Sequence, residues 1–445
     1  MTLTVVELND RAIKVGNDAG IIARSPGFAL ADGKIVHLGT EAEQQARLKP
    51  TQSYNKYWSE LSMEPLTHGN NFRHHADIAH AHLQHLAEIG GIDGEVIFAV
   101  PGNFSRQQLA ILLGLVQHSP MHTVGVVDAA VAAAMQSEPA MTTLVADIQL
   151  HQVVLSKLSM ASDQLTTDSV IQVPGVGSQH FMNLMMQLAT GLFIQQCRFN
   201  PQHNAESEQQ LYNALPAWLA QHEQDGNLIL ELQSGSTTHT AKMPRESLVA
   251  NLNGYYKKIL EQLLALAGSA NTRLVLSAEM AELPGFLATL EAFADKHVLG
   301  ADAVIVGSLM HQQHIVAGDS GLHLVQSLPL ATGASAKTIL SEVEKPTHVL
   351  YRHRAIPLRD LEIRNKNGAN GYAGLANTLE LNINGLPEVL GRIESRDDGV
   401  YLTSDISGVI VNQSKAAAEQ RLSLGDRIQF SNKSDSISLI RVADE

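Results

Sequence analysis

The sequence predicts an α/β protein with two lobes of similar topology, followed by a small all-β module. A strand meander and then alternating helix and strand patterns fill residues 1–138, and the same succession restarts in residues 139–317. Residues 318–345 form a connector rich in Gly, Ser and Ala. Short strand-like runs separated by Gly, Asn, Asp and Ser fill residues 346–445, which predicts a β-sandwich.

The first lobe is expected to begin with three strands. "LTVVEL" and "RAIKVG" have strand composition, with Asn9-Asp10 as the turn between them, and "AGIIAR" continues the meander. "HADIAHAHLQHLAEIGG" predicts a helix that a Gly-Gly pair ends. The buried strand "EVIFAVP" comes next, and then a helix that Ser105 and Gln108 begin as a capping box. The strand "TVGVV" leads to a last helix that starts at Asp128.

The second lobe repeats the strand meander with "TTLVAD", "QVVLSKL" and "SVIQVPG". "GNLILELQ" and "THTAKM" predict a hairpin, and "TRLVLS" a buried strand. The Met-rich run "MNLMMQLATGLF" is expected in the core, where methionine fills gaps. Pro216 is expected to interrupt its helix. The predicted helices cover roughly residues 178–197, 205–222, 245–268, 283–294 and 301–316.

Composition narrows the classes of partner and location. The formal net charge of -14 argues against nucleic acids and anionic membranes, since both attract a basic face. The single cysteine, Cys197, leaves no disulfide framework and fits a reducing compartment. The first residues lack the pattern of a secretory signal, and no run approaches the ~18 apolar residues of a membrane helix. We therefore expect a cytoplasmic protein.

Several motifs occur in an order known from one ATPase family. "EVIFAVPGNFSRQQLAILLGLVQHSPMHTVGVVDAAVAAAM" is similar to that family's V-P-x-x-F strand, helix, strand and N-E-P-T-A-A-A-L helix. "TRLVLSAEMAELPGFLATLEAF" and "LGADAVIVGSLMHQQHI" look like its V-L-V-G-G-S-x-R-I-P-x-V and D-E-A-V-A-x-G-A-A segments. About the first 315 residues thus resemble the nucleotide-binding domain of DnaK-type heat-shock chaperones, in the actin-like ATPase superfamily. The resemblance implies two RNase H-like lobes with a cleft for ATP and Mg²⁺.

The segments that would hold ATP depart from this family. The family's phosphate loops are rich in glycine, which lets the backbone approach a phosphate closely. Here the corresponding segments read "VELNDRAIKV" and "ADIQLHQVVL", and the adenosine motif G-G is Ser277-Ala278. We therefore expect no catalytic residues, no bound metal and no cofactor, with ATP and Mg²⁺ binding only if a weak site survives. The degenerate nucleotide-site positions are Glu7, Asp10, Asp128, Asp147, Gln149, Ser277 and Glu279.

The C-terminal module has a resemblance of its own. "GRIESRDDGVYLTSDISGVIVNQSKAAAEQRLSLGDRIQF" looks like the second half of a forkhead-associated domain, a family that reads phosphothreonine with an Arg and a Ser. In this sequence Arg392 follows a glycine but comes too late in the strand order, and Asp397 and Asp398 would repel a phosphate. Arg392 and Ser407 are expected not to face a common pocket, so the module is expected to bind no phosphopeptide.

A histidine-rich stretch raises the question of a metal site. His75, His82 and His85 have spacings that place them near one helix face. No HExxH-type carboxylate accompanies them, so a solvated helix face is the expected outcome.

The function predicted from these patterns is a non-catalytic, chaperone-like pseudo-ATPase that binds or scaffolds another protein. An intact chaperone-type ATPase is one possible partner, whereas nucleic acid and membrane are excluded. Two alternatives stay open: a weak ATP-binding chaperone, and a phosphopeptide-reading adaptor.

Overall fold

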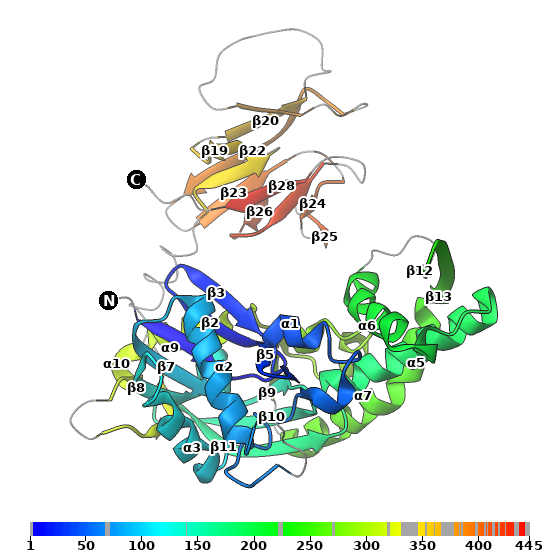
Figure 1. The fold of residues 1–445 in the computed structure, drawn as a ribbon. Coiled ribbons are helices and arrows are strands. Elements are labelled where there is room, and N and C mark those ends of the chain that lie inside the picture. The colour runs from blue at the N-terminus through cyan, green and yellow to red at the C-terminus, as the bar shows by residue number, and fades with distance from the viewer. Residues whose placement is uncertain are drawn as a thin grey trace. The chain divides into compact units, whose positions relative to one another are not determined.

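The structure, a computed structural model, describes two compact units of the chain, Met1–Leu330 and Ala331–Glu445 (Figure 1). Helices and mixed sheets build the N-terminal unit, and strands build the C-terminal unit. The described residues are 3–440 except 67–71, 139, 221–225, 269–271, 318–320, 331–345, 352–353, 360, 366–377, 382, 384–385, 397–398, 405, 407, 412–413, 417–418, 423 and 431–435.

One mixed sheet contains the first strands of the chain. Its order is β16 (Leu324–Val325), β8 (Met121–Asp128), β7 (Gly94–Val100), β1 (Thr4–Glu7), β2 (Ile13–Asn17) and β3 (Gly20–Ser25). The strands β1, β2 and β3 are antiparallel neighbours, whereas β7, β8 and β16 follow β1 in parallel. Asn9 begins the turn between β1 and β2, where its carbonyl accepts a hydrogen bond from the Ala12 amide at 3.0 Å. The predicted meander and its turn are confirmed.

A second mixed sheet repeats this arrangement. Its order is β15 (Lys296–Val298), β14 (Arg273–Leu276), β9 (Thr142–Ile148), β10 (Gln152–Ala161), β11 (Gln164–Pro174) and β17 (Ser327–Pro329). Here too the first three strands in sequence are antiparallel neighbours and the next two run parallel to the first. Apart from the short strands β16 and β17, both sheets therefore share one strand order and one set of directions, as the repeated sequence pattern predicts.

Helices α2 (His75–Gly90) and α3 (Arg106–Val116) pack against the first sheet and bury one apolar cluster with it. Gly91 ends α2 in the left-handed conformation (φ 59°), which glycine adopts without strain. Ser105 and Gln108 form the predicted capping box of α3. A small sheet adjoins this layer, with the order β5 (Ile35–Leu38), β4 (Ala29–Asp32) and β6 (Ser53–Tyr54), and with α1 (Gly39–Glu43) and the 3-10 helix η1 (Pro50–Gln52).

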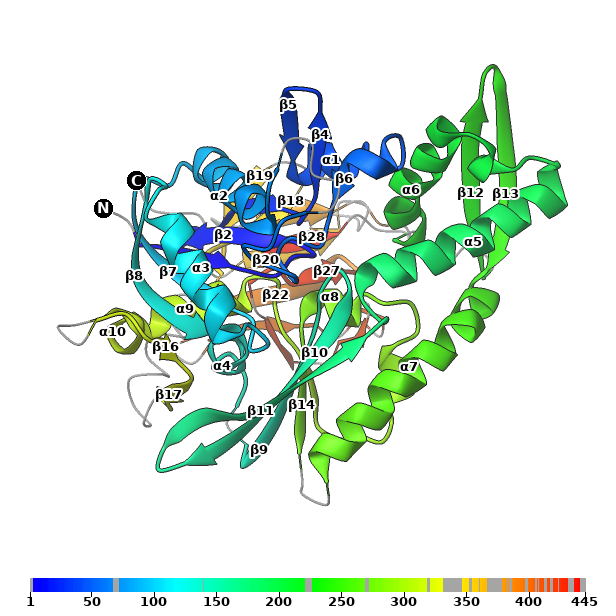
Figure 2. The ribbon, with the colours of Figure 1, turned by 60° about the horizontal axis from the view of Figure 1, so that its bottom comes forward.

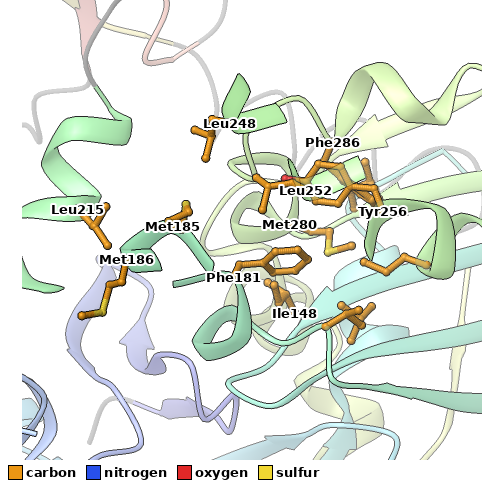
Figure 3. Packing of buried hydrophobic residues seen from close by; sticks show 14 of the residues in the cluster. Ile148, Phe181, Met185, Met186, Leu215, Leu248, Leu252, Tyr256, Met280 and Phe286 are labelled. Atoms are coloured by element: carbon orange, nitrogen blue, oxygen red, sulfur yellow. The ribbon is translucent and has the colours of Figure 1, made fainter. Parts of the chain in front are cut away.

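The second sheet is covered by longer helices, and Figure 2 shows α7 beside its strands. These elements are α5 (Ser178–Cys197), η2 (Pro201–His203), α6 (Ala205–Leu219), α7 (Arg245–Ala267), α8 (Ala278–Ala281) and the hairpin β12 (Asn227–Ser234) and β13 (Thr237–Pro244). Phe181, Met185 and Tyr256 are buried in their shared core (Figure 3). The Met-rich run therefore belongs to the core, as predicted.

A third apolar cluster joins the two sheets. It combines residues of the first sheet and of the second sheet, such as Val5 and Val145, with the helices α4 (Ala129–Ala134) and α9 (Ala303–Met310). α4 and α9 pack closely, because a Cβ on Gly307 would lie 1.9 Å from the Ala132 carbonyl oxygen. The pair α4 and α9 thus links the two halves of the N-terminal unit through a continuous core.

One sequence prediction about chain connections differs from the structure. The connector predicted at 318–345 begins too early, because β16 and β17 lie within it and extend the two sheets. Val325 and Leu328 are buried there, which outweighs the Gly/Ser-rich composition around them. The units divide after Leu330.

Three predicted helices also differ from the structure. The segment 283–294 contains only the 3-10 helix η3 (Leu287–Leu290), and Gly285 just before it has φ 75°, which is not a helical conformation. Pro216 lies inside α6, which continues to Leu219. The last helix breaks at His311 into α9 and α10 (Gln312–Ile315).

The C-terminal unit is all-β in its described residues, as predicted. One sheet has the order β19 (Arg354–Pro357), β18 (His348–Tyr351), β28 (Ile437–Ile440), β27 (Arg427–Gln429), β24 (Ile410–Val411) and β25 (Ser414–Lys415). The other has β21 (Thr378–Leu381), β20 (Leu361–Asn365), β22 (Val389–Arg396), β23 (Gly399–Thr403) and β26 (Glu419–Leu422). Both sheets contribute to one apolar core. Throughout the described chain, none of the helices has the length and apolarity needed to cross a bilayer.

Candidate functional site

Three chain segments meet where the resemblance would place a nucleotide. They are the turn between β1 and β2, the turn between β9 and β10, and the start of α8. Asn9 Nδ2 donates hydrogen bonds to Asp147 Oδ2 at 2.8 Å and to the Ile148 carbonyl at 3.0 Å. The Leu150 amide donates to Asp10 Oδ1 at 2.8 Å. Side chains of the first turn therefore bind the second turn directly.

A buried lysine extends this network to the third segment. Lys14 on β2 places its ammonium nitrogen 3.2 Å from Glu7 Oε1 and 3.0 Å from Glu279 Oε1. The exposed side-chain fractions are 5% for Lys14, 6% for Glu7 and 12% for Glu279, so the triad is largely removed from water. At the edge, Arg11 pairs with Glu282 at 3.4 Å. The triad and this outer pair both tie the first sheet's side of the unit to α8.

The carboxyl groups of this cluster outnumber its buried cation. Burial raises the pKa of Glu7 to about 7, with Lys14 opposing the rise and Asp147 and Glu279 adding to it. Burial also raises the pKa of Asp147, and the charge of Glu279 contributes. For Glu279, burial acts upward but Lys14 and hydrogen bonds outweigh it, so its pKa is lowered. The two glutamates overcome the burial of Lys14 and raise its pKa. Lys14 therefore stays protonated at neutral pH.

Asp10 lies beside the triad and is also perturbed. Burial raises its pKa to about 7, although amide hydrogen bonds from Leu150 and Arg11 oppose the rise. Asp10 Oδ2 and Glu7 Oε2 are buried and have no hydrogen-bond partner among the described residues. An unpartnered buried carboxyl oxygen is tolerated better when it carries a proton, which agrees with both raised pKa values.

The cavity at this junction is small. Its volume is about 40 Å³, and Glu7, Lys14, Asp147, Ser277 and Glu279 are among its lining residues. That volume holds two or three water molecules. Sites for drug-sized ligands usually measure about 300–1,000 Å³. The junction cavity by itself is therefore too small for a nucleoside triphosphate.

The side chains of the turn between β9 and β10 are packed in place. Gln149 and Leu150 are 4% and 3% exposed. Gln149 Oε1 accepts hydrogen bonds from Asn103 at 3.3 Å and from Gln152 at 2.8 Å. His151 Nε2 lies 2.9 Å from the Asn55 carbonyl oxygen. These side chains fill the second turn and keep its backbone amides away from any phosphate.

The predicted site positions are thus brought together in part. Glu7, Asp147, Ser277 and Glu279 line the small cavity. Asp10 and Gln149 line a neighbouring cavity of about 10 Å³. Asp128 is not among the lining residues of either, and it caps α4 instead. Its Oδ1 accepts from the Ala130 amide at 2.9 Å and its Oδ2 from the Thr167 hydroxyl at 3.0 Å.

Sequence reasoning missed the residues that hold the junction together, Asn9, Arg11 and Lys14. Lys14 stands between the buried residues Ile13 and Val15 on a strand, and period-two alternation would place such a lysine in solvent. The signal that could have revealed it is the excess of acidic residues in the three aligned segments, which requires a buried cation.

The histidine-rich helix differs from the expected solvated face. His82 is fully buried, with its Nε2 2.7 Å from Ser25 Oγ and its Nδ1 2.7 Å from the Tyr57 hydroxyl. Trp58 Nε1 donates to the same Nδ1 at 3.1 Å. Two donors on Nδ1 make it an acceptor, so Nε2 carries the proton and donates to Ser25. His82 is a neutral core residue, whereas His75 is only partly buried and contacts the Glu60 carbonyl.

Three arginines of the C-terminal unit, Arg364, Arg392 and Arg396, lie beside carboxylates. Arg364 pairs with Glu362 at 3.3 Å and with Glu388 at 3.5 Å. Arg392 lies 3.7 Å from Glu394 and Arg396 3.2 Å from it; Arg396 also pairs with Glu419 at 2.6 Å. The predicted separation of Arg392 from Ser407 cannot be followed here, since Ser407, Asp397 and Asp398 lie outside the described residues.

Phosphothreonine peptides are expected not to bind the C-terminal unit. A phosphate would have to displace a carboxylate from each of these arginines, and most of the binding gain would be lost. Fluorescence anisotropy with a degenerate phosphothreonine peptide library should show no saturable binding at micromolar concentration. Binding that Arg392→Ala abolishes and Arg421→Ala preserves would contradict this expectation.

Within the described residues, no three His, Cys, Asp or Glu side chains are grouped so that they could hold a metal ion. Comparison of the chain with protein-family profiles and with curated protein sequences finds no match.

Proposed function

We propose that this chain is a non-catalytic, chaperone-like pseudo-ATPase of the actin-like superfamily, which acts by binding or scaffolding another protein. One observation carries the proposal. The β1–β2 turn, the β9–β10 turn and the start of α8, which would bind a nucleotide in such an ATPase, are joined to one another by hydrogen bonds and ion pairs. In an ATPase of this type, phosphates and Mg²⁺ bridge the loops. Here Asn9, Asp10 and Lys14 make that bridge with side chains.

The topology supports the actin-like part of the proposal. Two sheets repeat one strand order with the same directions, and the helices α4 and α9 pack together in the core that both sheets share. A duplicated RNase H-like lobe has this arrangement. The ordered motifs of DnaK-type chaperones point to the same superfamily. The C-terminal unit, with two sheets around one core, agrees with a forkhead-associated-like sandwich.

The charge of the junction opposes nucleotide binding as well. A triphosphate is strongly anionic, whereas the junction contains Glu7, Asp147 and Glu279 around the single ammonium of Lys14. The turns β1–β2 and β9–β10 contain no glycine that would let their backbone amides approach a phosphate closely. A magnesium ion would have to displace the Lys14 ammonium from two carboxylates. Binding of the triphosphate and binding of the magnesium ion are therefore both disfavoured.

The role left to such a fold is recognition of a protein. The net charge of -14 disfavours nucleic acid and anionic membrane surfaces. We propose a cytoplasmic protein partner, and an intact chaperone-type ATPase is the specific candidate because related lobes associate with one another. Co-elution with a purified DnaK-type chaperone, at stoichiometric ratio in size-exclusion chromatography, would support that candidate.

ATP with Mg²⁺ at millimolar concentration is expected to leave the melting temperature unchanged. A ligand at 100 times its dissociation constant stabilises the native state by about 2.7 kcal/mol. For a unit of this size, that raises Tm by several degrees. Differential scanning fluorimetry with an intact DnaK-type chaperone as positive control provides the measurement. A dose-dependent rise in Tm, accompanied by phosphate release, would favour the alternative of a weak ATP-binding chaperone.

A further inference from the structure

A larger cavity lies next to the junction and has a different character. Its volume is about 410 Å³, which is within the range of small-molecule sites. Arg11 and Glu43 line one side, and residues of α5, α6 and the end of α8 line the other. It is ten times larger than the junction cavity, with which it shares Glu279.

Most of the lining is apolar. Phe181, Met182 and Met185 of α5 line the cavity together with Leu219 and Leu283. Phe181 and Met185 lie close together in the core view of Figure 3. Thioether and aromatic side chains adapt to flat or branched apolar ligands. The lining therefore favours a ligand with a hydrocarbon portion, because a ligand made only of polar groups would gain little from contact with these apolar side chains.

The charged residues at the rim are mostly neutralised by one another. Glu279 is paired with Lys14 at 3.0 Å, and Glu282 with Arg11 at 3.4 Å. Arg47 does not line the cavity; it lies over the Tyr212 ring and is paired with Glu208 at 3.6 Å.

Glu43 is the exception among the rim carboxylates. Its Oε1 accepts a hydrogen bond from the Tyr212 hydroxyl at 3.0 Å, and no ion pair to it occurs among the described residues. Burial raises the pKa of Glu43, and the Tyr212 hydrogen bond and the charge of Arg11 only partly oppose the rise. Tyr212 also contacts Gln179 Oε1 at 3.2 Å, so the hydroxyl is held in place and Glu43 is fixed at the cavity.

We propose that this cavity binds a small apolar molecule that bears a protonated amine. The amine would pair with Glu43, and the apolar body would lie against Phe181, Met182 and Met185. An anionic ligand is disfavoured because three glutamates line the cavity and its one lining cation, Arg11, is engaged. This inference does not depend on the loss of the nucleotide site.

Three naphthalene probes of similar shape test the inference: 1-naphthylmethylamine, 1-naphthylmethanol and 1-naphthoate. Titration calorimetry on the full chain is expected to show at least tenfold tighter binding of the amine than of the alcohol, as a charge-assisted hydrogen bond provides. Glu43→Gln should weaken the amine about tenfold and leave the alcohol unchanged. Leu219→Trp should fill the cavity and abolish both.

Glu41→Gln is the matched control, since Glu41 lies on the same helix but is 65% exposed and pairs with His37. It should leave amine binding unchanged. Equal affinity for amine and alcohol, tighter binding of the naphthoate, or an amine affinity insensitive to Glu43→Gln would each overturn the inference. Absence of binding by all three probes would overturn it as well.

Discussion

Replacing Lys14 with methionine is expected to destabilise the N-terminal unit by about 3–5 kcal/mol, the usual cost of removing one partner from a buried ion pair. Methionine preserves the length and apolar volume of the side chain, so the loss is mainly electrostatic. Glu7 and Glu279 would be left buried without their cation, with Asp147 nearby. Urea denaturation at neutral pH, followed by circular dichroism, measures the change.

Two further variants separate electrostatics from packing. Lys56→Met removes an exposed pair with Glu60, in which both side chains are more than half exposed, and should change stability by less than about 1 kcal/mol. Combining Lys14→Met with Glu7→Gln and Glu279→Gln should restore much of the lost stability, because the uncompensated charges are removed. A Lys14→Met protein within 1 kcal/mol of the parent would contradict the role of the triad.

Acidification is expected to destabilise the protein through His82 by roughly 4–5 kcal/mol between pH 7 and pH 3. Burial lowers the pKa of His82 to about 3, with the nearby His85 contributing, while the unfolded chain has the ordinary value of 6.5. The unfolded state therefore binds the proton first. The stability that neutral His82 provides is fully present above pH 6.5 and is lost as pH falls toward 3.

Comparison with His82→Gln isolates this contribution. The glutamine cannot titrate, so the stability advantage of the parent over the variant should shrink steadily from pH 7 to pH 4. His75→Gln, at a partly exposed position on the same helix, is the control for replacing a histidine outside the core. For Glu7 and Asp10, the dependence of stability on pH has the opposite sign. Their raised pKa values of about 7 give stability below pH 4 that is lost as pH rises through 7. If the difference in unfolding free energy between the parent and His82→Gln does not vary with pH, the assignment of His82 as a buried neutral imidazole is contradicted.

Much of the fold could be predicted because local signals agreed with the tertiary structure. The capping box at Ser105, the glycine end of α2 and the turn at Asn9 all depend on a few neighbouring residues. The repeated succession of strands and helices likewise predicted two sheets with matching strand order. Such agreement between local and global preferences is typical of natural sequences.

The remaining features depend on contacts between distant segments. Lys14 is buried because Glu279 meets it from a position far along the chain. His82 is buried because Ser25, Tyr57 and Trp58 surround its ring and form hydrogen bonds with it, although the sequence of its helix is rich in polar residues. The strand at Leu324–Val325 forms because β8 offers a sheet edge. No local pattern encodes these partners, so the sequence alone could not reveal them.

The most direct test of the central claim is amide hydrogen exchange in the turn between β9 and β10. The Leu150 amide donates to the Asp10 carboxylate, and Asn9 binds the Ile148 carbonyl, so the turn is closed by protein groups alone. We expect peptides covering residues 148–152 to be strongly protected without nucleotide and unchanged by millimolar ATP with Mg²⁺. Rapid exchange without nucleotide, followed by protection when ATP is added, would show that the cleft awaits a ligand and would contradict the account.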